Sequence, residues 1–322
     1  MADAYAQDIF GGYILQGNLK DALAYLDQFP EKAALYERYV KRFAEEPVLS
    51  EQIDPELDEI LVCYQKYYRD VFYLELDAAE AEARLRGRLE TLLGAEGAAL
   101  PDEPDNELDA VEEWLIAPLF REKGYFFLGG RTSGYYGPYV WKTEELKQYS
   151  VELPDGTQEY AVKLLDGFLS RSWVDYLTFG EIGTGGWTGG DGLIHCVRSA
   201  YDLESEDFRV SPLKHEAQHA QDLARYGQMS SADLEYRAKL VELIYSAERN
   251  LLRKFALQAN DSHTENGHAE AASRMAAGFE MLLHCSRGAF GEVPIPQIQA
   301  AARELFAQST RDTARKYLSS KE

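Results

Sequence analysis

The chain has 322 residues, of which 45% are hydrophobic and 12% aromatic, so it can bury a sizeable core and is neither disordered nor fibrous. Its formal net charge is −22, and an electrostatic field of that sign repels nucleic-acid phosphates and anionic lipids. The charge therefore argues against a nucleic-acid partner. The absence of a run of roughly 18 consecutive apolar residues argues against a membrane protein.

The cysteines and the N-terminal residues bear on the cellular compartment. The three cysteines, Cys63, Cys196 and Cys285, are odd in number and widely spaced, which predicts neither a disulfide framework nor a cysteine metal site. The N-terminal residues lack a basic region followed by a long apolar stretch, so we expect no secretory signal. The sequence therefore predicts a cytoplasmic protein and leaves its oligomeric state open.

The first part of the chain is expected to be helical. Apolar residues recur at three- and four-residue spacing through residues 1–95, and Asp77 and Gly94 are typical of the two ends of a helix. Residues 96–108 are acidic and contain two prolines, which is typical of a linker. The sequence thus predicts a helical domain at 1–95, a linker at 96–108 and a second domain at 109–322.

The second domain is expected to contain a small sheet followed by helices. Residues 124–200 are rich in Tyr, Phe, Val and Trp, which favour strands, and the pattern from Ser211 onward is helical. This order predicts an α+β domain within a mostly helical chain. We expect four strands, the first two joined as a hairpin at Pro154-Asp155-Gly156: Gln148–Leu153, Glu159–Leu165, Tyr176–Ile182 and Gly192–Tyr201.

A glycine-rich stretch, Gly183–Gly192, lies between the last two expected strands. It lacks the Lys-Ser/Thr ending of a phosphate-binding loop, and it leads into a strand rather than opening a helix. Two interpretations stay open. The stretch is either a long hairpin tip or a backbone segment that approaches a ligand closely.

The residues that indicate chemistry are His215, Glu216 and His219, in the pattern His-Glu-x-x-His. Residues four apart lie on one face of a helix, so both imidazoles can reach one metal ion. Glu216 points about 100° away around the helix, which favours a role as general base over a role as ligand. A helix with two buried histidines and no metal is the alternative.

This motif resembles that of the zincin superfamily of zinc metallopeptidases. The resemblance implies a small mixed sheet, an active-site helix and a third metal ligand further along the chain. It implies zinc held by three protein ligands, with Glu216 taking a proton from the metal-activated water that attacks a peptide bond. It also implies a peptide or protein substrate that pairs with an edge strand of the sheet.

The third ligand distinguishes the branches of that superfamily. The metzincin branch requires a glycine and a third histidine where this chain has Asp222 and Arg225. The gluzincin branch takes a glutamate from the next helix, commonly within Glu-x-x-Ala, and Glu235 with Ala238 supplies that context. Glu235 and Glu242 both border an apolar helix stripe, so Glu242 stays open as an alternative ligand.

Further candidates surround this set. Gluzincin relatives often place an aspartate four residues after the ligand glutamate, where it orients a ligating histidine, but this chain has Lys239 there. Asp222 or Glu242 could take over that role. Tyr245 and His268 are candidates for stabilising the developing oxyanion, although a surface position is the alternative for His268.

The substrate edge is predicted at Gly192–Val197, exposed and beside the His215–His219 helix, with Gly183–Gly190 as a mobile rim. The sequence thus favours a cytoplasmic zinc metallopeptidase. The alternative is a non-hydrolytic zincin-like protein with a structural or regulatory metal, which binds a partner through its helical N-terminal region.

Overall fold

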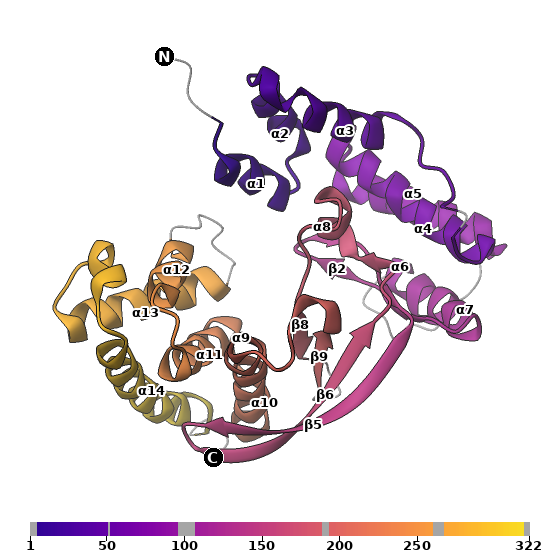
Figure 1. The fold of residues 1–322 in the computed structure, drawn as a ribbon. Helices are drawn as coiled ribbons and strands as arrows, with labels where there is room; N and C mark the ends of the chain where they lie inside the picture. Colours follow the sequence, from indigo (N-terminus) through magenta and orange to yellow (C-terminus); the bar gives the residue numbers. More distant parts are fainter. Residues whose placement is uncertain (1–4, 51, 96–106, 189–192, 260–266, 319–322) are drawn as a thin grey trace. The chain divides into compact units, whose positions relative to one another are not determined.

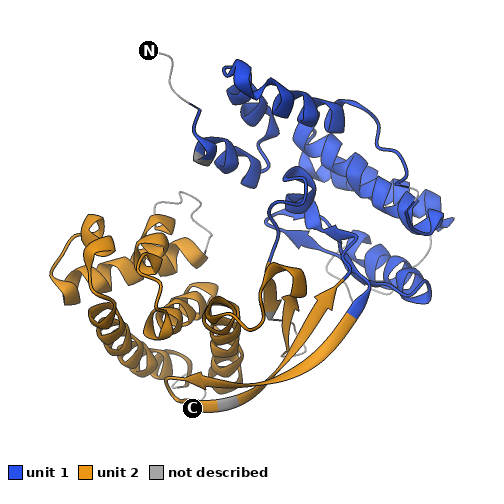
Figure 2. Cartoon of the chain, viewed as in Figure 1, with its two compact units in different colours: residues 1–143, 167–184 blue, residues 144–166, 185–322 orange. Residues whose placement is uncertain are grey.

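The computed structural model describes residues 5–50, 52–95, 107–188, 193–259 and 267–318. It is mostly helical with small sheets, which confirms the predicted α+β class (Figure 1). The chain forms two compact units: unit 1 comprises Met1–Thr143 with Gly167–Thr184, and unit 2 comprises Glu144–Asp166 with Gly185–Glu322 (Figure 2). Each unit has its own hydrophobic core.

Unit 1 begins with the helices that the sequence predicts: α1 (Gln7–Leu15), α2 (Leu19–Leu26), α3 (Ala33–Ala44), α4 (Pro55–Tyr68) and α5 (Ala78–Leu93). The ends of α5 follow the sequence signals. The side chain of Asp77 accepts hydrogen bonds from the backbone N–H groups of Ala79 and Glu80. Gly94 ends the helix with a φ of 62°, a left-handed conformation that favours glycine.

The rest of unit 1 consists of short elements. The helices α6 (Glu107–Val111) and α7 (Ala117–Glu122) lead into strands β1 (Phe126–Leu128), β2 (Arg131–Thr132), β3 (Tyr135–Tyr136), β4 (Tyr139–Trp141) and β7 (Ser170–Arg171). The predicted strand Tyr176–Ile182 is wrong, because helix α8 (Ser172–Leu177) and a turn occupy this region. Trp173 and Leu177 are both buried and lie four residues apart, which is the spacing of one face of a helix rather than of a strand.

The boundary between the two units, after Thr143, does not coincide with the predicted linker at 96–108. Residues 96–106 lie outside the described part of the chain, and Glu107 and Leu108 belong to α6. Val111, Phe120 and Trp173 pack in one core with the residues of α4 and α5. Because they share that core, the segment up to Thr143 groups with the N-terminal helices.

Unit 2 contains a four-stranded mixed sheet. Its strands β5 (Thr143–Leu153), β6 (Gly156–Asp166), β8 (Gly186–Thr188) and β9 (Ile194–Val197) are arranged in the order β5-β6-β9-β8. Neighbouring β5 and β6 form the predicted hairpin, whereas β9 runs parallel to β6 and antiparallel to β8.

The prediction of an exposed edge at Gly192–Val197 is wrong. Gly192 lies outside the described residues, and Ile194–Val197 pairs with β6 on one side and β8 on the other. Gly186 permits this pairing, since a Cβ there would lie 2.6 Å from the carbonyl oxygen of His195. Within the predicted rim, Gly186–Thr188 form β8, and Gly189 and Gly190 lie outside the described residues.

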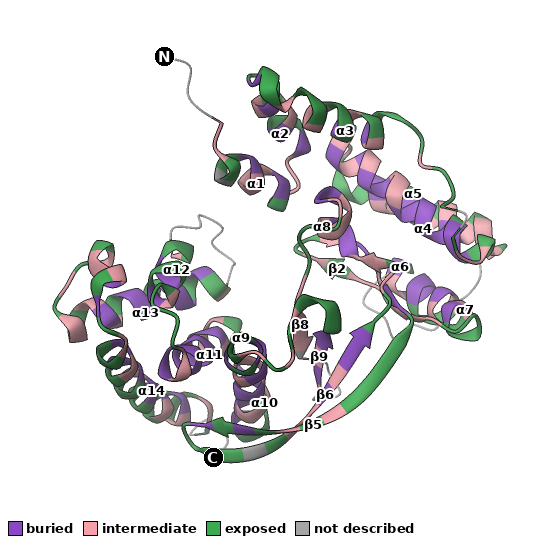
Figure 3. Cartoon of the chain, viewed as in Figure 1, coloured by how far each residue is buried: buried purple, intermediate pink, exposed green. Residues whose placement is uncertain are grey.

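The sheet of unit 2 packs against its helices: α9 (Glu206–Phe208), α10 (His215–Tyr226), α11 (Ser231–Tyr245), α12 (Leu251–Gln258), α13 (Gly267–Leu283) and α14 (Ile295–Leu318). The central helix is α11, which contacts α10, α13 and α14 and is buried over most of its length (Figure 3). Its polar side chains are therefore held in a largely water-free environment. Among the helices of the described segments, none is both long and apolar enough to cross a membrane.

Candidate metal centre

The helical stretch that leads into His-Glu-x-x-His begins at Glu206, before Ser211, where the sequence pattern predicts its start. Ser205 caps α9 by accepting a hydrogen bond from the backbone N–H of Phe208, and a π-helical segment, Arg209–Lys214, joins α9 to α10. Pro212 lies inside that segment, where the wider turn accommodates a residue without an N–H group. His215 is thus the first residue of α10, supported by helical turns on its N-terminal side.

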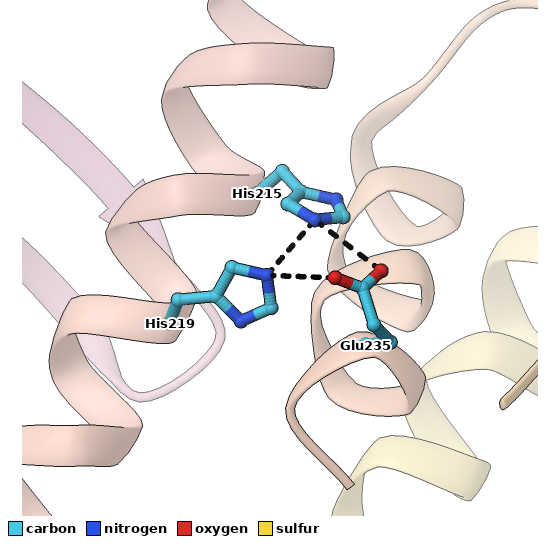
Figure 4. Close-up of side chains that lie close together, drawn as sticks. All are labelled: His215, His219 and Glu235. Atoms are coloured by element: carbon cyan, nitrogen blue, oxygen red, sulfur yellow. Dashed lines mark hydrogen bonds and ion pairs between the residues drawn. The ribbon is translucent and has the colours of Figure 1, made fainter. Parts of the chain in front are cut away.

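A short loop then returns the chain alongside α10. Gly227 ends α10 with a φ of 78°, and Ser230 caps α11 by accepting a hydrogen bond from the backbone N–H of Asp233. The loop that joins the two helices is short and comprises residues 227–230. It packs α11 against α10, so that Glu235 faces the two histidines (Figure 4).

His215, His219 and Glu235 converge on one point, and their ligand atoms all lie within 4.8 Å of one another. The Nε2 atoms of the two histidines are 3.0 Å apart. Oε1 of Glu235 lies 3.4 Å from Nε2 of His219, and Oε2 lies 3.7 Å from Nε2 of His215. The structure therefore brings together the two motif histidines and the predicted third residue.

These separations suit a metal of zinc's size. Zinc–nitrogen and zinc–oxygen bonds of about 2.0–2.2 Å place neighbouring ligand atoms of a tetrahedron roughly 3.4 Å apart. The two Nε2 atoms are 3.0 Å apart, and each lies 3.4 or 3.7 Å from a different oxygen of Glu235, so the observed separations are close to that value. Two imidazoles and a carboxylate also form a donor set that zinc accepts in open sites. The residues fit the metal in both geometry and chemistry.

Glu242 occupies a different position from Glu235. Its Oε1 lies 2.6 Å from Nδ1 of His215, on the far side of the ring from His219. Glu242 is 3% exposed, so this is a buried contact. Of the two roles that the sequence leaves open for Glu242, the geometry favours orienting His215 over ligating a metal.

The pKa values of His215 and Glu235 are shifted by this arrangement. Burial alone would lower the pKa of His215, but its contacts with the carboxylates of Glu235 and Glu242 outweigh burial and raise that pKa to about 10. Burial would raise the pKa of Glu235, but its contacts with His215, His219 and His268 hold that pKa well below its usual range. In the metal-free protein His215 is therefore a positively charged imidazolium at neutral pH, and a bound metal would displace one of its two ring protons.

Asp222 does not orient a histidine. Its Oδ2 accepts a hydrogen bond of 2.8 Å from Nε of Arg237, and both side chains are only 1% exposed. Arg237 also donates to the hydroxyl groups of Ser309 and Thr310 on α14. Because Asp222 follows His219 on α10 and Arg237 follows Glu235 on α11, this ion pair fixes the two ligand-bearing helices to each other.

We expect Arg237→Met to lower the free energy of unfolding by about 3–5 kcal/mol, because it leaves the buried carboxylate of Asp222 without its partner. Urea unfolding measures the change. The matched control is Arg274→Met, since Arg274 pairs with Asp233 but is 43% exposed, and exposed pairs contribute about 0–1 kcal/mol. Equal losses for the two variants would contradict the role assigned to Arg237.

Two further side chains contact Glu235. Nδ1 of His268, at the start of α13, lies 2.8 Å from Oε2 of Glu235, and the His268 side chain is 57% exposed. Nζ of Lys239 lies 3.9 Å from the same oxygen. Tyr245 contacts a neighbour of the motif, because Nζ of Lys214, the residue before His215, lies 3.9 Å from the centre of the Tyr245 ring.

Sequence reasoning missed Tyr201, which follows β9. A Cβ on Gly185 would lie 1.9 Å from the Tyr201 hydroxyl, so the phenol rests against the glycine backbone just before β8. Burial raises the pKa of Tyr201 to about 12, with further contributions from Cys196, Glu216 and Glu242. Tyr201 is therefore a neutral hydroxyl group within the electrostatic reach of the motif glutamate. Its sequence context carried no signal of this.

Comparisons with protein-family models, curated proteins and solved structures found no match for this chain. The function is therefore argued from the geometry and chemistry of the site.

Proposed function

We propose that this protein is a zinc-dependent metallopeptidase of the cytoplasm, with a zincin-like, gluzincin-type site in unit 2. The observation that carries the proposal is the convergence of His215, His219 and Glu235 at separations that suit one tetrahedral metal. Three protein ligands leave a fourth position open, which is the arrangement of catalytic rather than structural zinc sites.

A zinc ion held by these residues would lower the pKa of a water molecule to about 7 and would polarise a carbonyl oxygen. The chain's own residues would do the rest. Glu216 follows the first ligand on α10 and is half-buried, which suits a carboxylate that takes a proton from water and gives it to the leaving amine. The contact of Glu242 with Nδ1 of His215 would keep Nε2 of that ring directed at the metal.

An extended peptide needs a strand edge beside the metal. Of the described strands of the sheet, β8 is the outermost on its side, and it contacts α10. A peptide that paired with β8 would therefore lie beside the helix that carries both histidines. This supports a peptide or protein substrate, with β8 in the role that the sequence suggested for Gly192–Val197.

One observation favours the non-hydrolytic alternative. Nδ1 of His268 lies 2.8 Å from Oε2 of Glu235, so His268 is near enough to the three residues to become a fourth ligand after a side-chain movement. Four protein ligands would close the site and make the metal structural or regulatory. In that case the helices of unit 1 would serve a protein partner.

A hydrolysis assay distinguishes the two functions. We expect the zinc-loaded protein to cleave an unfolded protein substrate, a chelator to abolish cleavage, and re-added zinc to restore it. We expect His268→Ala to retain bound zinc, because three ligands suffice. A zinc-loaded wild type that cleaves nothing, together with a His268→Ala variant that loses its zinc, would favour the non-hydrolytic protein.

A further inference from the structure

Lys239 is a buried cation next to the candidate metal centre. It lies one helical turn after Glu235 on α11 and is 4% exposed. Its Nζ is 3.9 Å from Oε2 of Glu235 and 3.0 Å from Oε1 of Gln258, and it lies 4.5 Å from the centre of the Phe255 ring. Gln258 and Phe255 both belong to α12, so that helix holds the amine against the carboxylate.

A buried ammonium is costly unless it is paired. Burial lowers the pKa of Lys239, and the charges of Glu235 and Glu242 oppose that shift and favour the ammonium form. A methionine would fill a similar volume beside Phe255 at no electrostatic cost. Packing alone therefore does not explain a lysine at this position.

We propose that Lys239 is a built-in counter-ion that competes with the metal for the charge of Glu235 and so lowers the metal affinity of the site. The inference rests on the proposed metal site and concerns its regulation. In the metal-free protein the ammonium neutralises part of the carboxylate charge. When a divalent cation binds, two cations share one carboxylate in a buried environment, where their repulsion is weakly screened.

The consequence is a metal that exchanges with its surroundings. Without Lys239, Glu235 would still be held by His215, His219 and His268, so its position does not depend on the ammonium. Lys239 therefore changes how tightly the metal is held rather than whether the site can form. Occupancy, and with it activity, would follow the supply of free metal.

The test compares the zinc dissociation constants of the wild type, Lys239→Met and Lys254→Met, measured by competition with a chromophoric chelator. Lys254 is the matched control, because it lies on α12 with 62% of its side chain exposed and pairs with Glu248. We expect Lys239→Met to bind zinc about tenfold more tightly than the wild type. Lys254→Met should stay within about twofold. The rise in Tm on adding zinc should also be larger in Lys239→Met.

A Lys239→Met protein that binds zinc less tightly than the wild type, or less than about threefold more tightly, would overturn the inference. Misfolding tends to weaken a metal site, so a gain in affinity is not a consequence of structural damage. If circular dichroism shows that Lys239→Met is unfolded, Lys239→Gln carries the same prediction. A wild type that binds no zinc would instead overturn the proposed function, and this inference with it.

Discussion

Glu216→Gln is expected to abolish hydrolysis while the protein keeps its metal. The amide has nearly the shape of the carboxylate but cannot accept a proton from water, and loss of a general base typically costs roughly 10²–10⁴-fold in rate. Because Glu216 is not among the three converging ligands, metal content should not change. Measuring kcat/KM on a peptide substrate and zinc per chain on the same sample tests both parts.

The matched control for this variant is Glu206→Gln, the same chemical change at an exposed position in α9. It should cleave like the wild type. A fully active Glu216→Gln protein would show that another group takes the proton. Loss of zinc in that variant would show instead that Glu216 helps to hold the metal.

His219→Ala and Glu235→Ala are expected to lose zinc binding, with affinities more than about 100-fold weaker, because each removes a ligand. Glu242→Gln should weaken binding by about 10–100-fold, the usual cost of losing a group that orients a ligating histidine. This order follows from the contacts, since Glu235 faces the Nε2 atoms of both histidines and Glu242 contacts only Nδ1 of His215. Isothermal titration with zinc measures all three variants.

Glu304→Ala, at an exposed position on α14, controls for loss of a carboxylate and should bind zinc normally. Near-normal zinc binding by Glu235→Ala, combined with loss in Glu242→Ala or His268→Ala, would reassign the third ligand. The assignment of the two histidines would then stand without Glu235.

The parts of the site that follow from the sequence depend on local geometry. Helical spacing puts His215 and His219 on one face, and Gly227 allows the turn that brings Glu235 back to them. Glu235 was expected from the resemblance to the gluzincin pattern, whereas the spacing of the two histidines spans few residues, so a local pattern suffices to predict it. The same holds for the ends of α5 at Asp77 and Gly94.

The parts that did not follow depend on contacts between distant segments. The contact of His268 with Glu235 joins α13 to α11, and the hydrogen bonds from Arg237 to Ser309 and Thr310 join α11 to α14. No periodicity predicts such pairs. The sheet edge was misplaced because β9 pairs with β6 as well as with β8, and the alternation within β9 does not indicate either neighbour.

The central claim is that His215, His219 and Glu235 hold one zinc ion, and metal analysis of the protein purified without chelator tests it most directly. We predict one zinc per chain in the wild type, or uptake of one after zinc is added and the excess removed. The His215→Ala/His219→Ala double variant should retain none. A folded wild type that contains no zinc and takes up none would contradict the account.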